Sequence, residues 1–466
     1  MGKPKAQEVD LDTPSPVQSS KIFREHSVLQ SQKKPFAIMS ARSAIPFTPA
    51  ELWAEIFTHY LPSFHDSESA IEYEKHLLLL SSVCGHLRAV ALATPRLWSR
   101  IYVCTGRSES ERSRVGTWLE RSRGCSLTLI LKLGHGVGGS DGDVIRDILL
   151  HSRRWEHLSI SADSERRVYS EFKPFLKGKG NLPLLKEVGL DVPLLGHGDS
   201  LLSMFRDAPM LRSVNLRRMD SVHLLEELPL HQLRRLSLGR ETVTSARDFW
   251  GALVKMPDVE ELSVSVDVGP AFNGFQTELP ELPIVHPKLR SLAIDVAIRG
   301  DEMIIQRLRR ETADILDNLV VSRLESFSIA CGESHWPCEE SVRAFLERNG
   351  RSVERLKVLG KREGVKRAAR WAVSARMREV LGLVPRLATL EVMMCRKRLG
   401  EVIRMIDMES LLPRAEKLVL GVAPNRPDEE GDIDALKKDV LCLSGSRRMS
   451  LDSLSRSSSC FILCKN

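Results

Sequence analysis

The sequence has few aromatic residues, no long apolar run and no regular cysteine framework. Phe, Trp and Tyr make up 5% of its 466 residues, so aliphatic side chains dominate the 42% that are hydrophobic. No apolar run approaches the ~18–20 residues that a membrane-spanning helix needs. The nine cysteines are scattered, which favours free thiols in a reducing compartment. Because MGKPKAQEVDLD also lacks the apolar stretch of a signal peptide, we expect a soluble protein of the cytoplasm or nucleus.

The folded span also has little net charge. The formal charge of the chain is +7, and residues 1–44 and 443–466 contribute +3 each, which leaves about +1 for 45–442. A protein that binds duplex DNA normally carries a basic footprint on its folded surface. The charge distribution therefore argues against nucleic acid as a partner.

Catalytic and metal-binding motifs are absent as well. The sequence has no HExxH, GxSxG or kinase-type set. The glycine-rich segment 133–143 lacks the Lys-Ser/Thr pair of a phosphate-binding loop. Cys331, His335 and Cys338 lie close together, but tetrahedral zinc requires a fourth ligand. We therefore expect a binding protein without catalytic residues, metal or cofactor.

An apolar helical region follows the polar segment 1–44, which we expect to be disordered. The stretch 48–62 predicts a short helix, with Thr48 as N-cap, Pro49 at the first position and Pro62 after its end. After a polar insert, 63–75, the spacing predicts a second helix that starts at His76 and carries one apolar stripe. The residues of that stripe are Leu79, Val83, Leu87 and Val90. A third, short helix is expected from Pro95, leading into a strand at Ile101.

Ten copies of one apolar pattern follow, 22 to 35 residues apart. Each copy has an apolar residue, two others, an apolar residue, one other and a third apolar residue. The copies begin at Trp155, Leu185, Leu211, Leu233, Val259, Leu289, Leu324, Val353, Leu387 and Ala415. The last two apolar positions of each copy lie on one face of a strand, and the amphipathic stretches between copies predict covering helices. The spacing is typical of leucine-rich repeats and predicts an α/β solenoid of parallel strand–helix units.

The matching segments PAELWAEIFTHYLP, LLLLSSVCGHLRAVALATPRLWSRI and WLERSRGCSLTLIL resemble the F-box proteins, in particular the large group in mushroom-forming fungi. The resemblance implies a three-helix F-box at 45–105 that binds a Skp-type adaptor and, through it, a cullin-based ubiquitin ligase. It also implies a leucine-rich-repeat-like domain at 106–425, before a Ser/Arg-rich tail at 426–466 that we expect to be disordered. The adaptor contacts that it implies are Pro49, Leu52, Ile56, Leu61, Val83, Cys84, Leu97 and Trp98.

Residues 351–404 are the one strongly basic segment of the folded span. They hold fifteen Lys and Arg and five Glu, a local charge of +10. One interpretation is a solvated helix face, and the other is a patch that receives an acidic or phosphorylated target. Arg355, Lys357, Arg396 and Arg398 are the candidates for target binding, because we expect them to flank strands. RNA is disfavoured, because Trp371 is the only aromatic residue available for base stacking in this segment.

Two functions therefore stay open. The first is a substrate-recognition subunit that joins a target to the ligase. The alternative is a protein-binding scaffold that uses the repeat surface without docking to a ligase. Thr48 and Leu87 leave this alternative open, since the F-box family usually has Leu and Trp at these two positions.

Overall fold

The computed structural model describes residues 48–105, 110–134, 140–177, 181–194, 201–219, 222–239, 246–266, 283–296, 302–332, 339–361, 373–394, 396–409, 412, 414–422, 440, 449–454 and 460–465. All of its secondary-structure elements belong to one unit, Ala50–Asn466. The segment 1–44, which we expect to be disordered, lies outside the described residues. Across the described ranges, no helix combines the length and apolarity that crossing a membrane requires.

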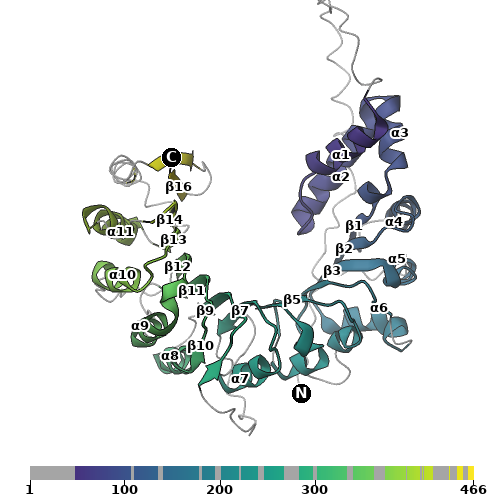
Figure 1. Ribbon diagram of the computed structural model, residues 1–466. Helices are drawn as coiled ribbons and strands as arrows, with labels where there is room; N and C mark the ends of the chain where they lie inside the picture. The colour runs from purple at the N-terminus through teal and green to yellow at the C-terminus, as the bar shows by residue number, and fades with distance from the viewer. Residues whose placement is uncertain are drawn as a thin grey trace, which may run out of the picture. The chain divides into compact units, whose positions relative to one another are not determined.

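The described residues contain eleven α-helices. These are α1 (Ala50–Tyr60), α2 (Ser67–Val83), α3 (Gly85–Ala93), α4 (Ser110–Arg121), α5 (Ser140–Leu149), α6 (Glu165–Lys177), α7 (Ala246–Val254), α8 (Glu302–Asp317), α9 (Glu339–Asn349), α10 (Val373–Gly382) and α11 (Arg396–Glu409). The first three form a helical region, with α2 and α1 both packed on α3. The helices α4 to α11 follow one another along one face of a sheet (Figure 1).

The sheet has fourteen strands, which lie almost in sequence order. They are β1 (Arg100–Cys104), β2 (Leu127–Leu133), β3 (Trp155–Ala162), β4 (Glu187–Asp191), β5 (Ser213–Leu216), β6 (Arg235–Leu238), β7 (Glu261–Val266), β9 (Ser291–Val296), β11 (Ser326–Gly332), β12 (Arg355–Lys361), β13 (Thr389–Met394), β14 (Lys417–Val422), β16 (Cys460–Lys465) and β15 (Met449–Leu454). A second sheet pairs β8 (Ile284–Val285) with β10 (Leu319–Val320). The fold is thus mixed α/β with a mostly parallel sheet, as the sequence predicts.

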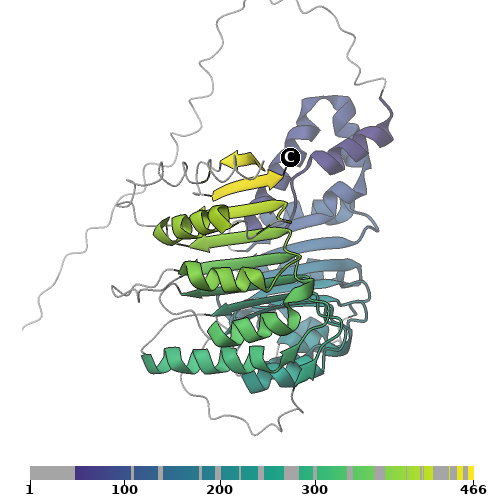
Figure 2. The same cartoon turned by 60° about the vertical axis from the view of Figure 1, so that its left-hand side comes forward.

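Every pairing from β1 to β14 is parallel. A parallel neighbour requires a crossover on one face of the sheet, which the helices between the strands supply. Figure 2 shows these helices stacked beside the strands that they connect. The opposite face of the sheet carries none of the helices α4 to α11 and is called the helix-free face below.

The core consists of the ten predicted apolar patterns. All three apolar positions of every copy are buried, from Trp155, Leu158 and Ile160 to Ala415, Leu418 and Leu420. The second position of each copy pairs in register with the second position of the next, for example Leu356 with Leu390. Because side chains alternate along a strand, this register places the last two apolar positions of every copy on the helix-covered face. The predicted buried positions are confirmed.

One expectation about the secondary structure is refined and one is wrong. The segment 198–209, expected to form a covering helix, contains a 3₁₀ helix, η4 (Leu201–Phe205), and another, η5 (Val222–Glu227), lies between β5 and β6. The copies that flank η5 begin at Leu211 and Leu233, 22 residues apart, which is the shortest spacing of the ten and leaves few residues for α-helical turns. The tail is not disordered throughout, because β16 pairs antiparallel with β14, and β15 pairs with β16. The strand β16 covers the edge that β14 would otherwise expose.

Candidate protein-binding surface

The helix α1 presents apolar side chains to solvent as well as to the core. Phe57 is buried at 1% exposure, whereas Leu52 and Ile56 are 56% and 47% exposed. Tyr60, four residues after Ile56, is 56% exposed. Residues four apart lie on the same side of a helix, so these three form one exposed apolar stripe.

The next helix, α2, begins earlier and ends earlier than the spacing predicts. The Asp66 side chain accepts a hydrogen bond from the Ser69 backbone, and the Ser69 hydroxyl accepts one from the Asp66 backbone. This reciprocal cap starts the helix at Ser67, within the segment expected to be a polar insert. The backbone becomes extended at Cys84, whose Sγ accepts a hydrogen bond from the Leu87 backbone and caps α3.

This break divides the predicted stripe into two halves with opposite environments. Leu79 and Val83 of α2 are 57% and 59% exposed. Leu87 and Val90 of α3 are buried. The prediction of one continuous stripe on one helix is therefore wrong, because Cys84 turns the chain between its two halves.

The exposed residues of α1 and α2 lie on neighbouring surfaces. The rings of Tyr60 and His76 meet edge to face, with their centroids 5.8 Å apart. His76 lies on the same side of α2 as the exposed residues Leu79 and Val83, which follow it by three and seven positions. We call the resulting surface the apolar helical surface; its members are Leu52, Ile56, Tyr60, Leu79 and Val83. Soluble proteins seldom leave so many large apolar side chains together in water unless a partner covers them.

The structure separates the eight residues proposed to contact the adaptor into two groups. Pro49, Leu52, Ile56 and Val83 are exposed, and Cys84 is partly exposed. Leu61, Leu97 and Trp98 are buried, at 6%, 1% and 1% exposure. The assignment of these three residues to a contact surface is wrong in this structure, because they form the core beneath it. Tyr60 and Leu79, which the resemblance does not include among the contacts, are exposed beside these residues.

Trp98 is held from several sides. Its indole N–H donates to the backbone oxygen of Ala91 at 2.8 Å. Its ring meets that of Trp118 edge to face at 5.1 Å, and the Arg121 guanidinium lies 4.4 Å from its centroid. The 3₁₀ helix η2 (Pro95–Trp98) thus anchors the helical region to α4.

Tyr73 connects α2 to the same 3₁₀ helix. Its hydroxyl donates to the backbone oxygen of Leu97 at 3.0 Å, and its ring packs edge to face on Phe64. Burial raises the pKa of Tyr73 to about 12, so the phenol keeps its proton for this bond. The hydrogen bond fixes the rotation of α2 about its axis and with it the outward direction of Leu79.

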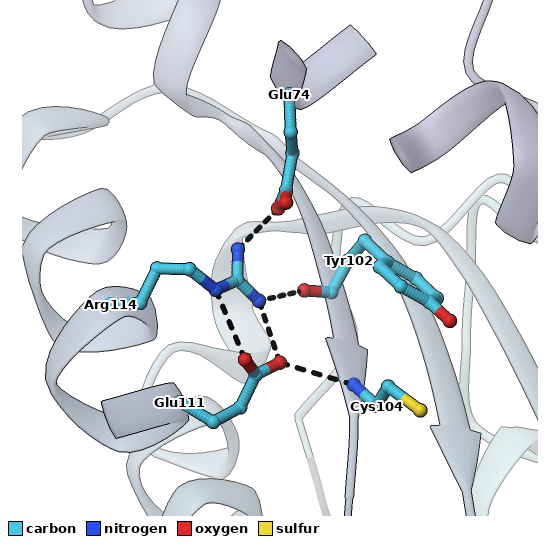
Figure 3. Close-up of polar contacts among 5 residues, drawn as sticks. All are labelled: Glu74, Tyr102, Cys104, Glu111 and Arg114. Atoms are coloured by element: carbon cyan, nitrogen blue, oxygen red, sulfur yellow. Dashed lines mark hydrogen bonds and ion pairs between the residues drawn. The ribbon is translucent and has the colours of Figure 1, made fainter. Parts of the chain in front are cut away.

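A polar network joins α2, β1 and α4 (Figure 3). Arg114 of α4 pairs with Glu111 at 2.7 Å, donates to the backbone oxygen of Tyr102 at 2.5 Å, and pairs with Glu74 of α2. Glu111 also accepts a hydrogen bond from the backbone of Cys104 at 3.2 Å. Because these side chains are mostly buried, the network holds the helical region in one orientation on the first strand.

The four candidates for target binding do not form one patch. Arg355 and Lys357 lie on β12, on the helix-free face, since Leu356 and Val358 point to the buried face. The Lys357 ammonium is paired with Glu391 at 2.5 Å, whereas the Arg355 side chain is exposed. Arg396 and Arg398 lie in the first turn of α11, which begins two residues after the end of β13. Their side chains lie outside the described residues.

The described residues contain no group of three or more His, Cys, Asp or Glu side chains that could hold a metal ion. Of the cluster Cys331, His335 and Cys338, the first lies on β11 and the other two lie outside the described residues. The chain thus presents surfaces whose chemistry is apolar contact and charge pairing. A comparison with known proteins found no family model that matches the chain and no curated protein with a matching sequence.

Proposed function

We propose that the chain is an F-box substrate-recognition subunit of a Skp–cullin–F-box ubiquitin ligase. In this proposal α1, α2 and α3 are the F-box, and the sheet with its helices is a leucine-rich-repeat solenoid that binds the target. The observation that carries it is the apolar helical surface, because its five large side chains are accessible and lie over a well-packed core. Docking of an adaptor would remove this surface from water, which is favourable in proportion to its area.

The proposed role requires no catalytic group in this chain. A subunit that holds both the target and the ligase raises the local concentration of the target near the activated ubiquitin, and this alone accelerates transfer. The polar network around Arg114 supports such a role. It fixes the apolar helical surface relative to the sheet, so a bound target would be held at a defined position.

The test is affinity purification of the full-length chain from native cells, with the variant Leu52→Asp, Ile56→Asp beside the wild type. Burying an unpaired carboxylate at an apolar interface costs several kcal/mol, so two of them should reduce adaptor recovery by about a hundredfold or more. The matched control is Leu150→Asp with Met303→Asp. Leu150 directly follows α5 and Met303 lies in α8, and their side chains are 78% and 76% exposed. The control should recover the adaptor and the cullin as the wild type does.

The alternative is a protein-binding scaffold that does not dock to a ligase. The burial of Leu61, Leu97 and Trp98 favours the scaffold, because buried side chains cannot supply three of the expected adaptor contacts. A wild-type purification that recovers other proteins without a Skp-type adaptor or cullin would support the scaffold. If the variant Leu52→Asp, Ile56→Asp recovers as much adaptor as the wild type does, the proposed docking surface is contradicted.

A further inference from the structure

Six exposed cations gather where the strands β11 to β14 begin. We call them the basic edge: Arg323, Arg351, Arg355, Arg386, Arg414 and Lys417. All six side chains are exposed, and among the described residues none has an ion-pair or hydrogen-bond partner. Neighbouring cations without partners repel one another, so an anion that joined them would be bound favourably.

The register places these cations side by side. The backbone N–H of Glu416 donates to the oxygen of Ala388 at 2.8 Å, and Arg414 and Arg386 each lie two residues before this bonded pair. Arg355, Thr389 and Lys417 occupy one row across β12, β13 and β14. Adjacent strands lie about 4.8 Å apart, so the Arg355 and Lys417 backbones are about 10 Å apart on the helix-free face.

Several cations of the same edge are paired with carboxylates at the earlier strands. Lys186 pairs with Glu156 at 2.6 Å, and Lys288 pairs with Asp258 at 2.5 Å. The hydrogen bond from Lys288 lowers the pKa of Asp258, which keeps that partner charged. Further along, Arg290 lies 3.4 Å from Glu325. Arg153 and Arg235, at the starts of β3 and β6, are also exposed without a side-chain partner among the described residues, but these two strands are not neighbours, whereas the basic edge gathers six such cations over the four neighbouring strands β11 to β14.

We propose that the basic edge binds an extended Asp/Glu-rich segment of a protein target. The cations are distributed along the edge, and side chains three residues apart in an extended chain are about 10 Å apart, which matches the row of Arg355 and Lys417. Arginine pairs with carboxylates through two parallel hydrogen bonds. This inference rests on the proposed function only where it identifies the acidic segment as part of a ligase target; the binding itself is argued from the cations.

Two features disfavour other polyanions. The segments 351–357, 386–389 and 414–419 contain no aromatic residue on which a base could stack. A phosphorylated side chain carries nearly two charges, which are best met by several cations converging on one point, whereas these are spread along the edge.

The test measures binding of a fluorescein-labelled peptide of repeated Glu-Gly-Ser units to the full-length chain by fluorescence anisotropy. Charge reversal by Arg386→Glu with Arg414→Glu should weaken binding about tenfold at low ionic strength, and the loss should shrink as salt screens the charges. The matched control is Arg153→Glu with Arg235→Glu. It reverses two exposed cations that likewise lack a side-chain partner among the described residues, and it should weaken binding less than about twofold.

Comparison ligands are the same peptide with Gln for Glu, with phosphoserine for Glu, and a single-stranded RNA of equal charge. Equal weakening in both double variants would show that only net charge matters and would overturn the site. Preference for phosphoserine or RNA over the Glu peptide would overturn the proposed occupant. Arg386→Gln with Arg414→Gln, which removes charge without reversing it, should show the same order of effects.

The adaptor is scored separately in the purification described above. If the wild type binds the Glu peptide through Arg386 and Arg414 but recovers no adaptor, the basic edge stands and the ligase proposal fails. If it recovers the adaptor but the peptide shows no dependence on these arginines, the basic edge fails and the ligase proposal stands.

Discussion

The helical region and the sheet place their apolar side chains differently. Along β3 to β14, every copy of the repeated pattern buries all three apolar positions. In α1 and α2, side chains of the same kind divide between a core at Phe57, Tyr73 and Leu77 and a surface at Leu52, Ile56 and Val83. A strand has two faces that alternate strictly, whereas a short apolar helix has more apolar positions than one neighbour can cover. The excess in the helical region leaves apolar side chains exposed to water.

The largest effects should come from the two cores. Trp98→Ala and Phe327→Ala each remove a nearly fully buried ring, and each should lower the free energy of unfolding by about 3–5 kcal/mol. Denaturant unfolding measures both. Only Trp98→Ala should also reduce adaptor recovery, because Trp98 supports the helical region. Equal loss of adaptor recovery in both variants would mean that adaptor binding depends on the sheet core as much as on the helical region.

Arg114→Leu should have an intermediate effect. The change removes the cation that lies between Glu74 and Glu111, whose side chains are only 19% and 17% exposed, and it should cost about 2–4 kcal/mol of unfolding free energy. Arg112→Leu, on the same helix, is the control. Arg112 also pairs with two carboxylates, but its side chain is 48% exposed, and the loss should stay below about 1 kcal/mol.

Similar losses for the two arginine variants would show that the network in Figure 3 is an ordinary surface ion pair. A larger loss for Arg114→Leu, accompanied by weaker adaptor recovery, would support its role in orienting α2. The comparison is made at one ionic strength, because salt weakens the exposed pairs of Arg112 more than the buried ones.

The smallest effect concerns the cap of α2. The backbone hydrogen bond from Ser69 lowers the pKa of Asp66. A carboxyl whose folded pKa is depressed contributes stability above its unfolded pKa of about 4, and this stability is lost as the pH falls through the folded value. Asp66→Asn keeps a capping oxygen but does not titrate. The variant should therefore show a weaker fall in melting temperature between pH 5 and pH 3, and an unchanged fall would contradict the cap.

Much of the sheet is predictable from the sequence, because the pattern is local and repeated. The alternation around Leu356 and Val358 identifies both a strand and its buried face without any knowledge of its neighbours. The start of α2 was harder to predict from the sequence, since the Asp66 and Ser69 cap lies in a segment whose composition resembles a loop. Cys84 has no helix-breaking character of its own, so its extended backbone was not predicted either.

The candidate sites show the same division. The resemblance assigns Leu52, Ile56, Leu97 and Trp98 to one contact surface, whereas the structure exposes the first two and buries the last two. The basic segment was visible as a local charge of +10 in residues 351–404. Its composition did not show that Glu391 neutralises Lys357, or that Arg386 and Arg414 stand at equivalent positions of neighbouring strands.

The sequence alone determined the α/β class, the number and spacing of the repeated patterns, and the side of each strand that is buried. These follow from periodicities of two and about four residues, which depend only on the local chain. The tertiary structure decided which apolar residues of α1 and α2 are left in water and which cations lack partners. Both outcomes depend on contacts between segments far apart in sequence, such as Trp98 with Trp118 and Lys357 with Glu391. No local pattern records those contacts.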